Sequence, residues 1–140
     1  MIDNKKKYGM ATKSIHSGQK PDKTTGDIMV PIYASSTYVQ ESPGKHKGYE
    51  YSRTQNPTRT AYEKCIADLE SGTHGFAFAS GMSAADCILG LLEVGDEVIA
   101  IDDLYGGTRR LFERVASNKS NLSFKFIDYN EFSNLESYIT

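Results

Sequence analysis

Short apolar runs alternate with segments of helical periodicity from residue 75 onward. The apolar runs are "GFAFAS" at 75–80, "EVIAIDD" at 97–103 and "LSFKFID" at 122–128. The helical segments that follow them occupy 82–94, 108–117 and 131–139. Parallel neighbouring strands need a long crossover connection, and a helix usually supplies it. This alternation therefore predicts an α/β fold built on a parallel sheet.

Upstream of these elements the pattern differs. Residues 58–70 place apolar side chains on one stripe and end at Ser71-Gly72, which predicts an amphipathic helix. Residues 1–57 lack sustained periodicity and are rich in Lys, Ser, Thr, Gly and Pro. We expect 1–57 to form an extended N-terminal arm that packs on a neighbouring subunit, and 58–140 to form the first part of an α/β domain that continues beyond this sequence.

Composition excludes several classes of function. The net charge of -2 gives no general attraction to nucleic acid, and no window approaches the roughly 20 apolar residues that span a membrane. Cys65 and Cys87 have no CxxC spacing, and the three histidines are not spaced as metal ligands. We expect a cytoplasmic protein that binds no metal, nucleic acid or membrane.

The turn "ASGMSAA" lies between the first strand and its helix. Gly81 lets a ligand approach the backbone, and the N–H groups of Gly81, Met82 and Ser83 open a helix whose positive end favours an anion such as phosphate. The alternative is a tight turn without a ligand, in which Ser83 and Asp86 form a capping pair.

A second turn, "DDLYGGT", follows the second strand. Ligands of open α/β sheets bind beyond the carboxyl ends of the strands, where the ring of Tyr105 can stack on a flat heterocycle. Alternatively, this ring covers the sheet edge. Asp102 and Asp103 lie about 20 residues after Gly81, as in dinucleotide folds, but the first turn has one glycine where that motif needs three. A nucleotide-binding module is therefore a weaker alternative.

Four motifs together resemble one family. "PIYASSTY", "YSRTQNPTR", "FASGMSAA" and "DDLYGGTRRLF", in this order and spacing, are similar to the Cys/Met-metabolism group of pyridoxal-phosphate enzymes. That group includes cystathionine γ-lyase, cystathionine β-lyase, cystathionine γ-synthase and methionine γ-lyase. The resemblance covers nearly all 140 residues. It implies an aspartate-aminotransferase-like fold and the cofactor pyridoxal 5'-phosphate.

The resemblance also implies roles for individual residues. Gly81 and Met82 would hold the cofactor phosphate through backbone N–H groups, and Tyr105 would stack on the pyridine ring near the reacting bonds. Tyr51 and Arg53 would reach the same phosphate from the neighbouring subunit. A guanidinium can hold two phosphate oxygens at once, which suits this role.

The remaining expectations concern the substrate and the covalent anchor. Arg110 matches a family arginine near the substrate end of the pocket, although a solvated arginine at a helix start is its alternative. The family's Schiff-base lysine has no counterpart among the eleven lysines, since none lies in an apolar strand-end setting that would lower its pKa. We therefore expect this chain alone to be inactive.

The function that the resemblance implies is a carbon-sulfur lyase of transsulfuration acting on cystathionine by β- or γ-elimination. The substrate would be a small sulfur-containing amino acid, and the enzyme a homotetramer built from dimers with shared active sites. The alternatives are cystathionine γ-synthase, which catalyses γ-replacement, and a non-catalytic truncated fragment.

Overall fold

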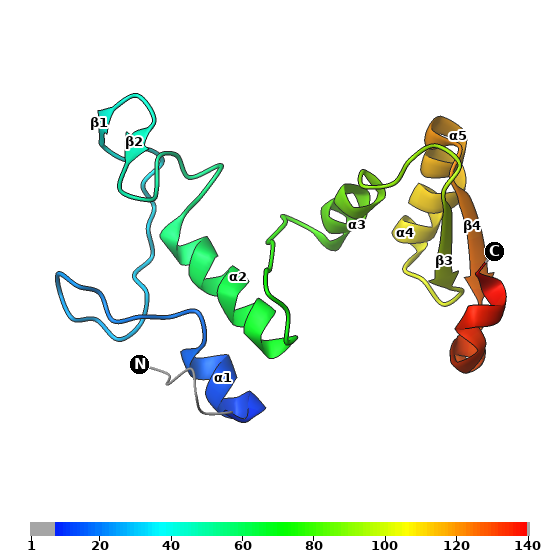
Figure 1. Cartoon of the computed structure of the whole chain (residues 1–140), viewed down its shortest axis with the longest axis horizontal. Coiled ribbons are helices and arrows are strands. Elements are labelled where there is room, and N and C mark those ends of the chain that lie inside the picture. The colour runs from blue at the N-terminus through cyan, green and yellow to red at the C-terminus, as the bar shows by residue number, and fades with distance from the viewer. Residues whose placement is uncertain (1–7, 140) are drawn as a thin grey trace. The chain divides into compact units, whose positions relative to one another are not determined.

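The computed structural model describes residues 8–139, which form two compact units that meet in the sequence between Ala77 and Phe78 (Figure 1). The first unit contains helix α1 (Met10–His16), a hairpin of β1 (Gln40–Ser42) and β2 (Lys45–His46), and helix α2 (Pro57–Leu69). The segment expected to be an extended arm thus carries one short helix and one short hairpin. Seven residues of helix are too few to give a clear periodic pattern.

Helix α2 begins at a well-formed cap. The side chain of Asn56 accepts hydrogen bonds from the backbone N–H groups of Thr58 and Arg59, and Pro57 occupies the first helical position. Both residue choices satisfy the hydrogen-bonding limits of a helix start. The helix was predicted over 58–70 and spans Pro57–Leu69, so its prediction is confirmed within one residue at each end.

The arm is fastened to this same helix start. The Thr58 hydroxyl donates to the Pro31 carbonyl at 2.9 Å and accepts from the Tyr33 N–H at 2.9 Å. The Asn56 side-chain amide donates to the Tyr33 carbonyl at 3.0 Å. Two side chains of the helix cap therefore fix the course of residues 31–33.

Helix α1 packs against the far end of α2. The Lys13 Nζ lies 2.9 Å from Asp68 Oδ1, and the buried Ser17 hydroxyl donates to Asp68 Oδ2. The Ser17 hydrogen bond, and next the one from Lys13, hold the pKa of Asp68 below its usual range. Gly18 follows in a left-handed conformation with φ of +76°, and a Cβ there would collide with the backbone oxygen of Ala61.

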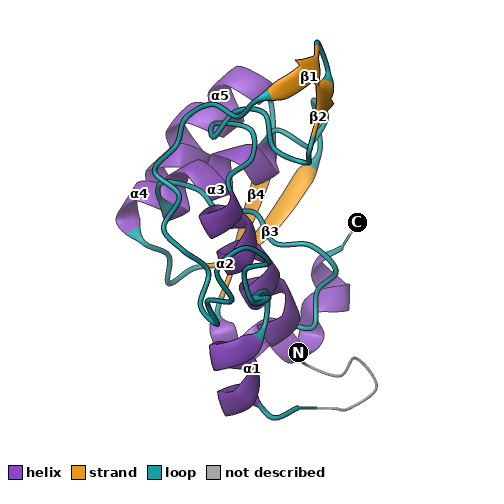
Figure 2. Cartoon of the chain, turned by 90° about the vertical axis from the view of Figure 1, so that its left-hand side faces the viewer, coloured by secondary structure: helices purple, strands orange, loops and turns teal. Residues whose placement is uncertain are grey.

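The second unit is a parallel pair of strands with a crossover helix. Its elements are α3 (Gly81–Leu89), β3 (Glu97–Ile101), α4 (Gly106–Arg110), the π-helix η1 (Leu111–Ala116), α5 (Ser117–Ser120), β4 (Ser123–Ile127) and the 3-10 helix η2 (Tyr129–Tyr138). Strands β3 and β4 pair in parallel from Glu97 opposite Ser123 to Ile101 opposite Ile127 (Figure 2). The predicted parallel arrangement of these two strands is confirmed.

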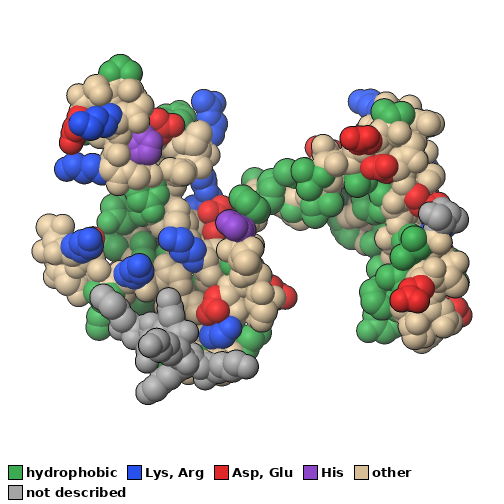
Figure 3. All heavy atoms as spheres, in the orientation of Figure 1, with side chains coloured by type: hydrophobic (Ala, Val, Ile, Leu, Met, Phe, Trp, Pro, Cys, Tyr) green, Lys and Arg blue, Asp and Glu red, His purple; other side chains and the backbone are tan. Residues whose placement is uncertain are grey.

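The core of this unit lies between the crossover helix and β4. Phe112 is buried and stacks on Phe124 with ring centroids 4.8 Å apart, while Ala116, Leu122 and Ile127 are also buried. By contrast, large apolar side chains stay exposed along the segment around α3 (Figure 3). The clearest examples are Ile88, Leu91 and Val94. Exposed apolar surface of this kind marks contact with further protein.

Three expectations about local structure were wrong. Residues 75–80 form no strand, because no strand in the described part of the chain pairs with them. The helix predicted over 82–94 ends at Leu89, with Gly90 as its C-cap. The next helix begins at Gly106 rather than at Thr108, and its N-cap residue Tyr105 makes no side-chain capping bond.

Candidate functional site

The N-terminus of α3 presents unused hydrogen-bond donors. Ser80 is its N-cap residue, and the Ser80 hydroxyl accepts a hydrogen bond from the Ser83 N–H at 3.1 Å. Within residues 8–139, the N–H groups of Gly81 and Met82 donate to no protein acceptor. The capping pair of Ser83 and Asp86, which was the alternative without a ligand, is not seen among the described residues, and Ser80 pairs with Ser83 instead.

These two donors are accessible. Gly81 is exposed, and a Cβ placed on it would meet nothing within 4 Å. Two free N–H groups at the positive end of a nine-residue helix can bind an anion without moving any side chain. The residues present therefore fit the phosphate of a cofactor.

Tyr105 lies beside this helix start. Its ring packs over Gly107, where a Cβ would sit only 2.5 Å from Tyr105 Cε1 and 3.2 Å from Met82 Sδ. The Thr108 hydroxyl contacts the same sulfur at 3.6 Å. The structure thus brings Tyr105 and Met82, predicted from separate turns, to one place. With 74% of its surface exposed, Tyr105 leaves a ring face free for a flat ligand.

The two arginines of α4 have different partners. Arg109 stacks its guanidinium 4.2 Å from the Phe126 ring centroid and donates to the Asp102 carbonyl at 3.3 Å. The exposed Arg110 donates from Nε to the Gly106 carbonyl at 3.2 Å. Arg109 therefore ties the helix to the strand end, whereas the contact that the described residues give the Arg110 side chain lies within its own helix.

Tyr51 and Arg53 belong to the first unit and face one another. The Arg53 guanidinium carbon lies 5.2 Å from the centroid of the Tyr51 ring, a cation–π contact. The Ser52 N–H between them donates to the Ser36 carbonyl at 2.8 Å. Tyr51 and Thr37 form an isolated antiparallel β-bridge. Among the residues that the structure describes, Arg53 forms no ion pair with an acid, so its charge is available to a ligand.

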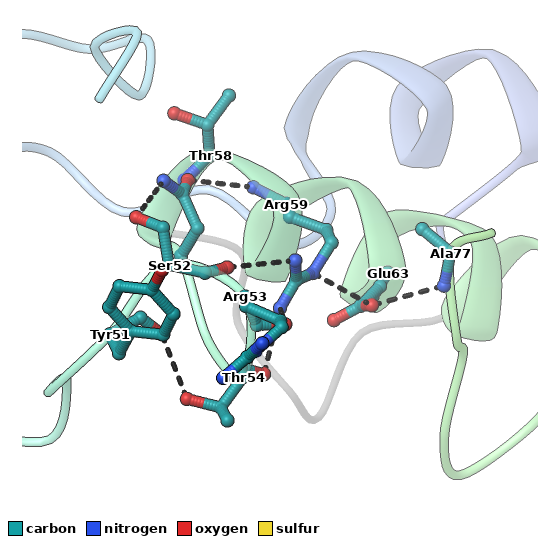
Figure 4. A network of polar contacts seen from close by, with 9 residues as sticks. Tyr51, Ser52, Arg53, Thr54, Thr58, Arg59, Glu63 and Ala77 are labelled. Carbon is teal, nitrogen blue, oxygen red and sulfur yellow. Dashed lines mark hydrogen bonds and ion pairs between the residues drawn. The ribbon is translucent and has the colours of Figure 1, made fainter. Parts of the chain in front are cut away.

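Sequence reasoning missed Arg59. Its guanidinium donates to the carbonyl oxygens of Ser52, Arg53 and Thr54, at 3.0, 3.3 and 2.7 Å (Figure 4). One signal was present in the sequence, since Arg59 and Glu63 stand four residues apart on a helix and form an ion pair at 3.5 Å. The contact with three loop carbonyls has no signal in the sequence.

A cleft of the first unit lies elsewhere. Its volume is about 1200 Å³, and Lys13, Tyr33, Tyr49, Lys64 and Asp68 are among the residues that line it. None of the predicted site residues lines it. Its walls mix apolar residues such as Val30 and Pro31 with polar ones, of which Lys13 and Asp68 pair with each other, and we assign it no ligand.

In the part of the chain that the structure describes, no group of three or more His, Cys, Asp or Glu side chains is arranged to hold a metal ion. Over the same residues, no helix is both long and apolar enough to cross a bilayer.

Comparison with known proteins places these features in a family. A sequence model of the family "Cys/Met metabolism PLP-dependent enzyme" matches residues 11–140. The chain is 57% identical over 138 residues to a cystathionine beta-lyase of Coxiella burnetii, covering 99% of this chain and 36% of that protein. It is 54% identical to a probable cystathionine gamma-synthase of Herpetosiphon aurantiacus, covering 86% of this chain and 38% of the other. The chain thus spans about a third of the length of these curated relatives.

Solved structures agree with this placement. The metB protein of Corynebacterium glutamicum superimposes with a TM-score of 0.87 and 39% identity, covering 95% of this chain and 35% of that one. A cystathionine gamma-lyase of Lactobacillus plantarum, complexed with L-serine, superimposes with a TM-score of 0.84 and 44% identity. The match covers 95% of this chain and 34% of that one. The predicted α/β fold is confirmed.

Proposed function

Because the chain belongs to the Cys/Met metabolism PLP-dependent enzyme family, we propose that it forms the cofactor-binding part of a carbon-sulfur lyase of transsulfuration. The substrate is a small sulfur-containing amino acid of the cystathionine type. The observation that carries this proposal is that the side chains of Tyr105 and Met82 both lie beside Gly107, with Met82 in the first turn of α3. A phosphate site and an aromatic face lie side by side there, as a phosphorylated pyridine requires.

Each part of this site has one task. The N–H groups of Gly81 and Met82 bind the phosphate of pyridoxal 5'-phosphate, and Tyr105 stacks on its ring and keeps water from one face. When bound, the cofactor supplies an electron sink for the electrons left at the α-carbon of an amino acid after it loses a proton. This chain's residues would hold the cofactor phosphate and cover one face of its ring.

Tyr51 and Arg53 complete the phosphate site of a neighbouring subunit in this proposal. The mutual contact of the two side chains and the free charge of Arg53 support it. The arm, residues 1–57, lies on that neighbour. Large apolar side chains exposed on the arm support such a contact, namely Ile28, Met29, Ile32 and Val39. The minimal assembly is then a dimer, and two dimers form a homotetramer.

Arg110 faces the substrate in this proposal. Among residues 8–139 only its Nε is engaged, so the terminal nitrogens of the guanidinium can bind a substrate carboxylate. We further propose a cytoplasmic location, which the two free cysteines, Cys65 and Cys87, support.

A chimera tests the proposal. The 140-residue sequence replaces the matching segment of the C. burnetii cystathionine beta-lyase, 57% identical to it. We expect the purified chimera to be yellow, to retain the cofactor covalently after borohydride reduction, and to release a thiol or pyruvate from cystathionine. The isolated 140-residue chain should form no such covalent adduct at one unique lysine. A colourless chimera that binds no pyridoxal phosphate contradicts the proposal.

Cystathionine γ-synthase activity is the second candidate, because a relative with that name is almost as similar to the chain as the β-lyase. The chimera separates the two when it is given cysteine and an activated homoserine. Formation of cystathionine indicates γ-replacement, whereas its breakdown indicates a lyase.

A further inference from the structure

Arg59 holds the main chain of the loop that presents Tyr51 and Arg53. Three successive carbonyl groups, those of residues 52, 53 and 54, converge on its two terminal nitrogens at 2.7–3.3 Å (Figure 4). The side chain is 32% exposed, so water competes for these bonds only in part. A planar guanidinium with five N–H donors is the side chain best able to satisfy three carbonyls together.

The position of Arg59 is unfavourable for a helix considered alone. It is the third residue of α2, where the positive end of the helix dipole repels a cation. The ion pair with Glu63 also has the arginine on the N-terminal side, the weaker order for this spacing. The hydrogen bonds to the loop carbonyls therefore offset the unfavourable electrostatics of an arginine at this position.

Glu63 anchors Arg59 from the other side. Its Oε1 lies 3.5 Å from Arg59 Nε and accepts a hydrogen bond from the Ala77 N–H at 3.0 Å. The Glu63 side chain is 22% exposed. The carboxylate thus fixes the guanidinium plane between the helix and the loop, and a continuous polar chain joins the loop to residue 77.

We propose that Arg59 is a positioning residue for cofactor phosphate binding, and that Glu63 orients it. Arg59 engages only the carbonyl side of residues 52–54, so the side chains of Tyr51 and Arg53 stay free to reach the phosphate. A loop ordered before binding loses less entropy when the phosphate arrives. This inference rests on the proposed function.

The test measures phosphate-dependent affinity rather than activity. The cofactor is removed from the chimera, and dissociation constants are measured for pyridoxal phosphate and for pyridoxal, which lacks the phosphate. We expect Arg59→Gln to weaken the binding of pyridoxal phosphate about tenfold, the scale of one charge-assisted hydrogen bond, and to leave the affinity for pyridoxal unchanged. Arg59→Lys should weaken the binding of pyridoxal phosphate nearly as much, because an ammonium cannot donate to three carbonyls in this geometry.

Two matched controls accompany these variants. Arg114→Gln removes an exposed arginine whose side chain makes no hydrogen bond or ion pair within residues 8–139. Glu41→Gln removes an exposed i,i+4 ion pair with Lys45, matched to Glu63→Gln. Both controls should bind pyridoxal phosphate normally, whereas Glu63→Gln should weaken it by a few-fold.

A double variant separates positioning from a purely structural role. In an Arg53→Ala background the loop no longer presents the Arg53 guanidinium to the phosphate. Adding Arg59→Gln should then lower the affinity for pyridoxal phosphate by less than twofold. Equal losses for pyridoxal and pyridoxal phosphate, or fully additive losses in the double variant, overturn the inference while leaving the proposed function intact. An unaltered chimera that binds no pyridoxal phosphate overturns the proposed function, and this inference with it.

Discussion

Gly107→Ala is a test of the place that the structure gives the Tyr105 ring. A Cβ at residue 107 would lie 2.5 Å from Tyr105 Cε1, whereas ordinary contacts begin at 3.4 Å. The ring must therefore move by at least about 0.9 Å, the difference between these two distances. Gly107 lies inside α4 and the colliding atom belongs to an exposed side chain, so the ring can move while the backbone stays in place.

The expected energies follow from these two facts. Replacing a helical glycine by alanine stabilises the fold by up to about 1 kcal/mol. Forcing the tyrosine away from its rotamer costs about 0.5–1.5 kcal/mol. The free energy of unfolding should therefore change by no more than about 1.5 kcal/mol. Loss of ring stacking, worth about 0.5–1.5 kcal/mol, should weaken the binding of pyridoxal phosphate about two- to twelvefold.

The assay combines urea unfolding with cofactor titration of the chimera. Gly106→Ala is the matched control, because a Cβ at residue 106 meets nothing within 4 Å. In a Tyr105→Ala background, Gly107→Ala should have no further effect on binding. Unchanged cofactor affinity in the single variant would refute the reasoning, and so would a loss of stability above about 2 kcal/mol.

Three further predictions concern the first unit. Gly18→Ala should destabilise it by at least about 1–2 kcal/mol in urea unfolding, because residue 18 has a left-handed φ and its new Cβ would meet the Ala61 carbonyl; an unchanged midpoint would contradict this. Because the folded pKa of Asp68 lies below its ordinary value of 3.8, its hydrogen bond with Ser17 stabilises the fold above about pH 3.8 and is lost as the pH falls through the lower folded value. Asp68→Asn should therefore lower stability at neutral pH and remove this acid-dependent loss, measured by unfolding at several pH values. Arg53→Ala should weaken retention of pyridoxal phosphate, rescued by excess cofactor, and unchanged retention in dialysis would show that Arg53 does not touch the phosphate.

The elements that could be predicted are those whose signals are local. Asn56 and Pro57 mark the start of α2 because capping depends on neighbouring residues alone. Strands β3 and β4 follow from apolar runs of the right length. Residues 75–80 form a similar short apolar run, but a strand exists only beside a partner, and an apolar run does not say whether one lies alongside.

The candidate site divides in the same way. The rule that ligands bind beyond the ends of parallel strands pointed to the turns of Met82 and Tyr105, and the structure places these two residues together. Their contact with a cofactor stays a prediction. Arg59 was missed because its partners are backbone oxygens, which every residue has, so no residue type in the loop marks the contact. The helix start at Gly106 was misplaced because two glycines disfavour a helix on propensity alone.

The contacts of helix α2 predict how a dimer of two different variant subunits would behave. Through Arg59 and Glu63 it joins the loop of Tyr51 and Arg53 to residue 77, three positions before the cap at Ser80. If each chain lends that loop to its neighbour, a defect in α2 is expressed in the other subunit's site. In a hybrid dimer of one Arg59→Gln subunit and one Gly81→Val subunit, both lesions would then fall on the same pocket, and the second pocket would be undamaged.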